Sequence, residues 1–204
     1  TAVSARAGIL VKDRLALERM RTIDAVLFDK TGTLTTGTHT VTDVAGVDGV
    51  TSDQVMSWAA AVEADSEHPL ARAIVSAAAG RGEIATATGF TNTPGRGVEA
   101  SVDGAIVSVG GPAMLRDRDL PEPADLAATT AEWRQRGAAV LHVIRGDRIV
   151  GALVLEDQIR PESKTAIDEL RQLGVRSVMI TGDAQQVADR VGAQLGVDEV
   201  FAEV

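Results

Sequence analysis

The sequence of 204 residues lacks cysteine and tyrosine, and aromatic residues make up only 2% of it. Without cysteine, this stretch can form neither a disulfide nor a thiolate metal site. With so few aromatic side chains, a stacking platform for nucleic-acid bases is not expected. Small aliphatic side chains must build the core, and the hydrophobic fraction of 45% is sufficient for a globular domain.

Positive charge is also scarce. The 20 Lys and Arg residues face 29 Asp and Glu residues, giving a net charge of −9, which argues against a nucleic-acid partner. No apolar run reaches the ~18 residues that a membrane helix needs, and residues 1–6 lack an apolar signal-peptide core. We therefore expect a soluble chain. Its abrupt start and the strand-like segment at 200–204 suggest an excised fragment.

Both ends of the chain have the pattern of an α/β fold. The apolar run at 24–28 predicts a buried strand that delivers Asp29 to the edge where open α/β sheets bind ligands. Residues 9–20 predict a short strand at 9–11 followed by a helical stretch. After residue 150, the pattern predicts a helix from Pro161 to Gly174, a strand at 175–180, a helix at 184–195 and a strand from Val200.

The middle of the chain has a different pattern. The dipeptides Asp103-Gly104 and Gly146-Asp147 each lie between short apolar runs and predict hairpins. Helices are predicted at 52–64, from Pro69 to about Gly80, and at 124–136. We therefore predict one α/β domain, residues 1–37 and 151–204, interrupted by an inserted α+β domain, residues 38–150.

The string Asp29-Lys30-Thr31-Gly32-Thr33-Leu34-Thr35 indicates the chemistry most clearly. A strand that ends in an aspartate followed by a Gly- and Thr-rich loop is a nucleophile arrangement, because the carboxylate can attack phosphorus to give an acyl phosphate. The N–H groups and hydroxyls of the loop can hold the transferred group. An Asp-x-x-Gly segment alone is most simply a turn, but the full string is far more specific.

This string resembles the phosphorylation motif of P-type ATPases, within the haloacid-dehalogenase-like superfamily. Further segments resemble heavy-metal pumps in the same order, so the likeness covers essentially the whole chain. These segments are Ser66-Glu67-His68-Pro69-Leu70, Pro94-Gly95-Arg96-Gly97-Val98, Asp157-Gln158-Ile159-Arg160-Pro161-Glu162-Ser163 and Thr181-Gly182-Asp183. The resemblance implies a Rossmann-like phosphorylation domain interrupted by an α+β nucleotide-binding domain, with ATP and Mg²⁺ as ligands.

The resemblance assigns roles to the residues that match the phosphorylation motifs. Asp29 would accept the phosphoryl group, and its carboxylate would bind Mg²⁺ together with the backbone carbonyl of Thr31. Lys30 would add positive charge nearby. Thr181 would bind a phosphate oxygen in a loop shaped by Gly182 and Asp183, and Asp157 would help to position the nucleotide side. Without the resemblance, Asp157 could be only a cap residue for the helix that Pro161 begins.

In the inserted domain, the resemblance places Glu63, His68, Gly95, Gly97 and Val98 around adenine and ribose. Glycines allow the backbone to approach a flat ligand closely, and a neutral imidazole can stack on a base or form a hydrogen bond with it. Considered alone, His68 is most simply a helix cap, and the two glycines are most simply part of a turn.

Two alternatives to a pump are a soluble phosphatase of the same superfamily and a nucleotide-binding module without activity. Such phosphatases resemble one another in carrying a second aspartate two residues after the nucleophile, as a general acid and base. Thr31 occupies that position here, which favours a persistent aspartyl phosphate. One departure from the heavy-metal pattern is Gly110-Gly111, where those pumps usually have Gly-Asn. The lysine and the Gly-Asp-Gly-x-Asn-Asp segment of the family are also absent, so we expect little phosphorylation of this chain alone.

The resemblance further implies partners that this sequence does not contain. The transported transition-metal ion, for which copper or silver is favoured over zinc, cadmium or cobalt, would bind among transmembrane helices. An actuator domain would belong to the same polypeptide, at the cytoplasmic face of a membrane. His39 and His142 have no partner at metal-ligand spacing, and His142 is most simply a semi-buried strand residue. Trp58 and Trp133 lie in helical patterns and are most simply packing residues.

Overall fold

The computed structural model describes residues 8, 13–82 and 84–204. The strands are β1 (Ala25–Asp29), β2 (Thr35–Gly46), β3 (Ala87–Thr93), β4 (Gly97–Val102), β5 (Ala105–Gly110), β6 (Ala139–Arg145), β7 (Arg148–Ile159), β8 (Arg176–Ile180) and β9 (Glu199–Phe201). The helices are α2 (Arg14–Arg19), α3 (Ser52–Glu63), α4 (Pro69–Ala78), α5 (Pro112–Asp117), α6 (Ala124–Gln135), α7 (Pro161–Gln172) and α8 (Gln185–Leu195). A short 3₁₀ helix η1 (Met20–Thr22) precedes β1, and a tight loop η2 (Lys30–Leu34) follows it.

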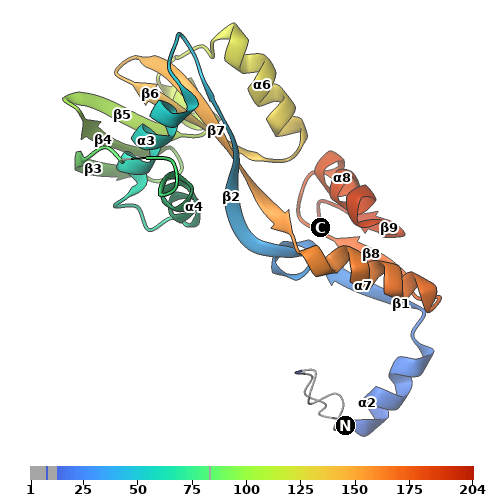
Figure 1. The fold of residues 1–204 in the computed structure, drawn as a ribbon. Coiled ribbons are helices and arrows are strands. Elements are labelled where there is room, and N and C mark those ends of the chain that lie inside the picture. The colour runs from blue at the N-terminus through green and yellow to red at the C-terminus, as the bar shows by residue number, and fades with distance from the viewer. Residues whose placement is uncertain (1–7, 9–12, 83) are drawn as a thin grey trace.

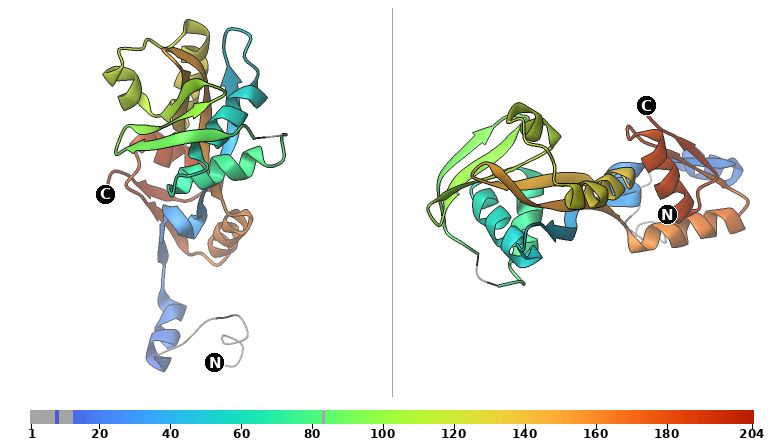
Figure 2. Two further views of the ribbon diagram at one scale, coloured as in Figure 1. Left: turned by 90° about the vertical axis from the view of Figure 1, so that its left-hand side faces the viewer. Right: turned by 90° about the horizontal axis from the view of Figure 1, so that it is seen from above.

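Two lobes are joined by the long strands β2 and β7 (Figures 1 and 2). One lobe contains a six-stranded antiparallel sheet in the order β2-β7-β6-β5-β4-β3, and the other a three-stranded parallel sheet in the order β1-β8-β9. The expected mixed α/β architecture is confirmed. Among the described residues, no helix has both the length and the apolar character needed to cross a bilayer.

Local sequence signals account for most helix ends. Thr51 and Gln54 form a capping box at the start of α3, with each side chain bonded to the other residue's backbone N–H. Proline occupies the first helical position of α4, α5 and α7, where its missing N–H costs no hydrogen bond. Gly196 ends α8 in the left-handed conformation, at φ +78°. The predicted hairpins are confirmed as β4–β5 and β6–β7.

The six-stranded sheet is packed on both faces. Helices α3 and α4 cover one face in a core that includes Val55, Ile74 and Leu153. Helices α5 and α6 lie over the other, where Trp133 and Leu126 are buried. Both tryptophans therefore pack as predicted, Trp133 within the second core and the half-buried Trp58 against the first.

The pairing of β2 with β7 was not predicted from the sequence. It extends from Thr35↔Ile159 to Gly46↔Gly151, with two register shifts along the ladder. Positions 37 and 150, at which the two domains were predicted to divide, both lie inside these strands. The division at 37/38 and 150/151 therefore remains a prediction.

Strand β1 is less buried than predicted. Leu27 is 61% exposed, whereas Phe28 is half-buried. The reason is that β1 is an edge strand and helices α7 and α8 pack on the face that carries Phe28 and Met179. No described residue buries the opposite face at Leu27. The strand predicted at 9–11 lies outside the described residues.

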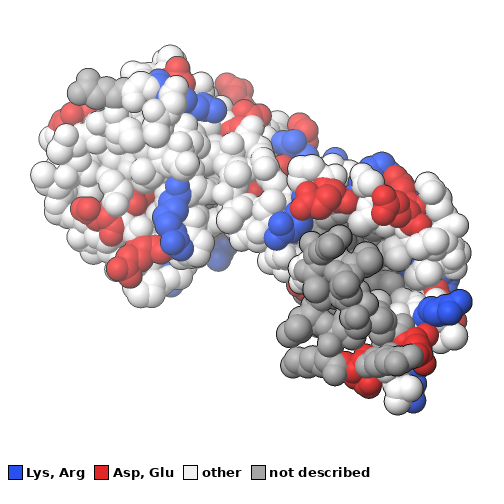
Figure 3. Space-filling view, turned by 60° about the horizontal axis from the view of Figure 1, so that its bottom comes forward, with Lys and Arg blue, Asp and Glu red and all other residues white. Residues whose placement is uncertain are grey.

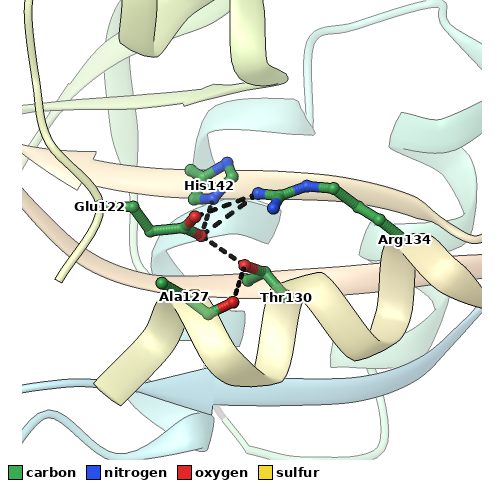
Figure 4. A network of polar contacts seen from close by, with 5 residues as sticks. All are labelled: Glu122, Ala127, Thr130, Arg134 and His142. Carbon is green, nitrogen blue, oxygen red and sulfur yellow. Dashed lines mark hydrogen bonds and ion pairs between the residues drawn. The ribbon is translucent and has the colours of Figure 1, made fainter. Parts of the chain in front are cut away.

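A buried polar network links α6 to the sheet (Figure 4). His142 on β6 is fully buried, not semi-buried as expected, and its Nε2 lies 2.6 Å from Glu122 Oε1. The same carboxylate accepts hydrogen bonds from Thr130 Oγ1 at 2.7 Å and from Arg134 Nη2 at 3.2 Å. Burial alone would raise the pKa of Glu122, but these hydrogen bonds outweigh it and lower the pKa. Burial lowers the pKa of His142, and contact with Glu122 only partly offsets this effect.

Candidate active site

Asp29 occupies the carboxyl end of β1, as predicted. It is in register with Ile180 at the end of the parallel strand β8, so Thr181 begins the neighbouring loop at the same edge of the sheet. Thr181 is buried, Asp183 is half-buried and Gly182 is exposed. The topology therefore brings the two predicted phosphate loops together, at the sheet edge where α/β folds bind ligands.

The loop after Asp29 is a tight turn of five residues. Thr31 has an extended backbone, at φ −78° and ψ 121°, and Gly32 adopts φ +77°, a conformation that glycine reaches without a Cβ penalty. Thr35 closes the loop, since its backbone N–H donates to the carbonyl oxygen of Lys30 and its Oγ1 lies 3.0 Å from the same oxygen. The backbone N–H of Gly32 in turn donates to Thr35 Oγ1 at 3.2 Å.

Asp157 on β7 fixes the start of β2 from the side. Its Oδ2 accepts a hydrogen bond from Thr35 Oγ1 at 2.5 Å, and its Oδ1 accepts one from the backbone N–H of Gly37 at 3.0 Å. The alternative that Asp157 merely caps the following helix is wrong, because Arg160 is the residue at the N-cap of α7. Asp157 lies within β7 and orders the nucleophile loop, a role that depends on strand pairing and not on local sequence.

Arg160 and Ser163 were not singled out from the sequence, although both lie in the motif that begins at Asp157. Arg160 Nε donates to the carbonyl of Thr35 at 3.0 Å, and its Nη2 donates to the carbonyl of Gly32 at 3.1 Å. Ser163 Oγ donates to the carbonyl of Leu34 at 2.9 Å. Together they satisfy backbone acceptors that an exposed loop would otherwise present to water.

Lys30 points towards the second loop. Its Nζ lies 2.6 Å from Asp183 Oδ2, and the Lys30 side chain is only 12% exposed. The backbone N–H of Asp183 donates to Thr181 Oγ1. A cavity of about 480 Å³ adjoins Lys30, Asp157 and Asp183, between the long strands and α8. Asp29 itself is exposed, and its carboxylate makes no hydrogen bond or ion pair with any described residue.

The residues predicted to surround a nucleotide lie together in the other lobe. Glu63, His68, Gly95, Gly97 and Val98 all line one cavity of about 220 Å³. The cavity lies where the α3–α4 connection meets the ends of β3, β4 and β5. Its remaining lining residues are Ser66, Leu70, Asn92, Thr93, Arg96, Val109, Gly110, Gly111 and Leu141.

Glu63 and His68 form the polar wall of this cavity. Glu63 is 6% exposed, and burial raises its pKa, although the hydrogen bond with Ser66 acts in the opposite direction. His68 is the N-cap of α4, and its Nδ1 accepts the backbone N–H of Leu70 at 3.2 Å. The capping interpretation is therefore confirmed, and it does not conflict with ligand binding, because Nε2 has no hydrogen bond within the described chain.

Both glycines that line the cavity have positive φ values, and Gly97 has no room for a side chain. Gly95 and Gly97 have φ values of +73° and +146°, and a Cβ at Gly97 would overlap the carbonyl oxygen of Val109. Asn92, Thr93 and Arg96 were missed as lining residues. Arg96 belonged to the quoted glycine motif, but no sequence signal singled out Asn92, whose place depends on the pairing of β3 with β4.

The cavity and the nucleophile loop lie in different lobes (Figure 1). Figure 3 shows the two lobes joined by a narrower waist, with Lys and Arg side chains scattered among acidic ones on this face. The structure thus brings each group of predicted residues together but does not join the two groups in one pocket. A ligand that spans them requires the lobes to approach each other.

Comparison with known proteins agrees with this arrangement. A family model described as a haloacid dehalogenase-like hydrolase matches residues 23–204. The copper-exporting P-type ATPase B of Archaeoglobus fulgidus is 39% identical over an alignment that covers 100% of this chain and 29% of that protein. The probable copper-exporting P-type ATPase V of Mycobacterium tuberculosis is 40% identical over an alignment that covers 100% of this chain and 27% of that protein. The chain spans less than a third of the length of these relatives.

Solved structures are similar over the same extent. A zinc-transporting PIB-type ATPase in the E2.Pi state matches with a TM-score of 0.88 and 37% identity, over 100% of this chain and 33% of that one. The catalytic domain of the CPx-ATPase CopB-B matches with a TM-score of 0.70 and 25% identity, over 96% and 68%. The chain therefore belongs to the haloacid dehalogenase-like hydrolase family, and over its whole length it is similar to part of copper-exporting and zinc-transporting P-type ATPases.

Proposed function

We propose that this chain is the ATP-binding and phosphorylation segment of a pump that transports a transition-metal ion, copper or silver, through an aspartyl-phosphate intermediate at Asp29. The observation that carries the proposal is the exposed Asp29 carboxylate, which has no partner among the described residues and lies at the start of a hydrogen-bonded loop. Asp157 and Arg160 hold that loop. A nucleophile held in this way needs little rearrangement to attack.

In the proposed reaction, a carboxylate oxygen of Asp29 attacks the γ-phosphorus of ATP. The new O–P bond forms as the bond to the β–γ bridging oxygen breaks, and ADP leaves with that electron pair. Water later cleaves the acyl phosphate, which restores the carboxylate and releases inorganic phosphate. Thr31 supplies a hydroxyl where a general base would be needed, so hydrolysis depends on another group and the intermediate persists.

The residues around Asp29 fit a magnesium ion. Oxygen donors at an exposed carboxylate and at the Thr31 carbonyl are the ligand type that Mg²⁺ prefers. When bound, the ion would neutralise charge on the transferring phosphoryl group. Thr181 lies beside Asp29 and would donate its hydroxyl to a phosphate oxygen. The ion pair with Asp183 orients Lys30, which would add positive potential at the same edge.

Nucleotide binding is proposed for the cavity lined by Glu63, His68, Gly95, Gly97 and Val98. Its volume of about 220 Å³ suits a base and its apolar floor suits a flat ring. NMR titration of this chain with ATP should shift the resonances of these residues. Shifts that cluster in residues 124–150 would contradict the assignment.

The phosphorylation step is tested in the full-length protein that carries this segment. Asp29→Asn retains the shape of the side chain but removes the nucleophilic carboxylate, so acid-quenched labelling with γ-labelled ATP should fall to background. Asp24→Asn is the matched control, since Asp24 is an exposed aspartate just before β1 and should retain full labelling. Label that persists on the Asp29 variant would assign the acceptor to another residue.

The transported ion, the transmembrane helices and the actuator domain belong to the proposal only for the whole protein. Similarity to copper-exporting relatives and to a zinc-transporting pump supports the transition-metal class. Transport of radiolabelled copper and zinc into vesicles that contain the full-length protein would distinguish these ions. Fast hydrolysis of simple phosphate esters by the chain alone would instead favour the phosphatase alternative.

A further inference from the structure

Strand β3 contributes one side-chain amide to the nucleotide cavity. Asn92 is in register with Val98 on β4, and Val98 is in register with Val109 on β5. Residues opposite each other in an antiparallel ladder share a face of the sheet. Val98 and Val109 are buried in the core beneath α3 and α4, so Asn92 lies on the same face, at the edge of the cavity floor.

Asn92 is available for a ligand. It is exposed, and its carboxamide forms no hydrogen bond with any described residue. Its carboxamide offers a neutral donor and a neutral acceptor on a single rigid group in the cavity lining. Gly110 and Gly111, on the neighbouring rim, provide no side chain.

The cavity has two polar sides with an apolar floor between them. Glu63 and His68 come from the helices, Asn92 comes from the edge strand, and Val98 and Leu141 lie on the floor. A flat ring resting on this floor would present one edge to the helices and another to β3. Asn92 is therefore placed to read the hydrogen-bonding pattern along a ring edge.

We propose that Asn92 selects adenine over guanine, an inference that rests on the nucleotide site proposed above. Adenine presents the N6 amino group as a donor beside the N7 acceptor, and a carboxamide pairs with both in a bidentate manner. Guanine presents two acceptors, O6 and N7, along the same edge, so one of the two hydrogen bonds is lost.

The test is isothermal titration of this 204-residue chain with ATP, GTP and 7-deaza-ATP. The unaltered chain should prefer ATP to GTP by about tenfold, as expected when a bidentate contact discriminates between bases. Asn92→Ala should lower ATP affinity about tenfold and leave GTP affinity within about twofold. 7-Deaza-ATP lacks the N7 acceptor, so it should bind the unaltered chain more weakly than ATP does. The Asn92→Ala variant should bind ATP and 7-deaza-ATP with equal affinity.

Asn92→Asp provides a second arm. Its carboxylate has no donor for N7, so it can accept only from the N6 amino group of adenine, and it meets the two acceptors O6 and N7 of guanine; the affinity for ATP should fall, and the affinity for GTP should fall at least as much. Thr91→Ala is the matched control, because Thr91 precedes Asn92 on β3, is exposed and pairs with Glu99 outside the cavity. Its affinities for both nucleotides should be unchanged, and thermal unfolding should be alike in all variants because both positions are exposed.

Failure of this inference differs from failure of the nucleotide site. If ATP binds and His68→Ala weakens it, but Asn92→Ala lowers ATP and GTP affinity equally or not at all, Asn92 does not read the base. If ATP does not bind the unaltered chain, or binds unaffected by changes at both His68 and Asn92, the nucleotide site itself is wrong and this inference fails with it.

Discussion

The two lobes differ in how their sheets are packed and in how far apart in the sequence their paired strands lie. The six-stranded sheet has hydrophobic cores on both faces, whereas the three-stranded sheet has one core built around Leu34, Ile167 and Met179. In the larger lobe neighbouring strands are mostly joined by short hairpins. In the smaller lobe β1 pairs with β8 across the whole inserted region, and such a pairing must overcome a much larger loop-closure entropy.

This difference matches the two tasks that we propose. The nucleotide cavity lies on a packed scaffold, so its shape depends on apolar burial and on backbone conformations that only glycine adopts easily. The nucleophile loop is held by side-chain hydrogen bonds from Asp157, Arg160 and Ser163. Polar contacts of this kind can be exchanged for contacts with a phosphoryl group, which apolar packing cannot provide.

The lobes can be followed separately in experiments. Trp58 and Trp133 are the two tryptophans of the sequence, and both lie in the six-stranded lobe. Tryptophan fluorescence during urea unfolding therefore reports on that lobe, while amide hydrogen exchange in β1 and β8 reports on the other. The five predictions that follow use this separation.

The largest effect is expected for Gly97→Ala. Its φ of +146° is almost closed to other residues, and the new Cβ would overlap Val109 O and approach Met114. We expect a loss of about 3 kcal/mol or more in the unfolding free energy of the larger lobe, with loss of ATP binding. Gly95→Ala is the matched control, because its Cβ has open space and only the φ of +73° is unfavourable, at a cost of about 1 kcal/mol. If the two variants lost the same unfolding free energy, the structure would have shifted to relieve the overlap between the new Cβ at position 97 and Val109 O.

The next largest effect is expected for Glu122→Ala, which leaves His142 and Thr130 without their buried partner. We expect a loss of about 2–3 kcal/mol from the larger lobe at pH 7.5, measured by urea unfolding and fluorescence. Glu132→Ala, at an exposed position of α6, should change stability by less than about 0.5 kcal/mol. Hydrogen exchange in β1 and β8 should stay the same in both variants.

The hydrogen-bonded pair of Glu122 and His142 predicts that the free energy of unfolding of the larger lobe falls in acid. The pKa values of Glu122 and His142 are both lowered in the folded protein, so the unfolded chain binds protons more readily and stability rises with pH. The His142 contribution declines below its ordinary pKa of 6.5. The Glu122 contribution is lost below 4.5. Glu122→Gln should flatten the lower part of this profile, and an unchanged profile would contradict the stabilising role of the carboxylate.

A smaller effect, confined to the other lobe, is expected for Thr35→Val. The change keeps the side-chain shape but removes the hydroxyl that joins Asp157, the Lys30 carbonyl and the Gly32 N–H. We expect a local loss of about 1–2 kcal/mol, seen as faster amide exchange at Gly32 and in β1. Thr33→Val is the control, since Thr33 is exposed and makes no side-chain hydrogen bond within the described chain. A change in tryptophan fluorescence would show that the lobes are coupled.

The smallest effect is expected for Arg145→Leu. The guanidinium carbon of Arg145 lies 4.7 Å from the centre of the Trp58 ring, as in a cation–π contact. Its loss should lower the stability of the larger lobe by about 0.5–1 kcal/mol. Arg145→Lys retains the charge but loses planar stacking, so its stability should lie between that of the unaltered chain and that of Arg145→Leu. If Leu and Lys lower the stability equally, the retained charge contributes nothing, which would contradict a cation–π contact.

Local signals in the sequence were enough to predict much of the fold. The helices that begin at Pro69 and Pro161, and the hairpins at Asp103-Gly104 and Gly146-Asp147, depend on backbone preferences of a few adjacent residues. The nucleophile motif was recognisable for the same reason, because its residues are contiguous. The residues proposed to bind ATP were chosen from short motifs, and the structure places them together in one cavity.

Other features depended on contacts between residues far apart in the sequence. Strand β2 carries glycine and threonine without clear alternation, and it is extended because β7 supplies its hydrogen bonds. Asp157 orders the nucleophile loop, and Asn92 reaches the cavity, only through strand register. The exposure of Leu27 follows from the edge position of β1. The sequence alone determined the local elements and the reactive motif, whereas tertiary structure decided strand pairing, burial and side-chain partners, because these depend on long-range hydrogen bonds and packing that no local pattern encodes.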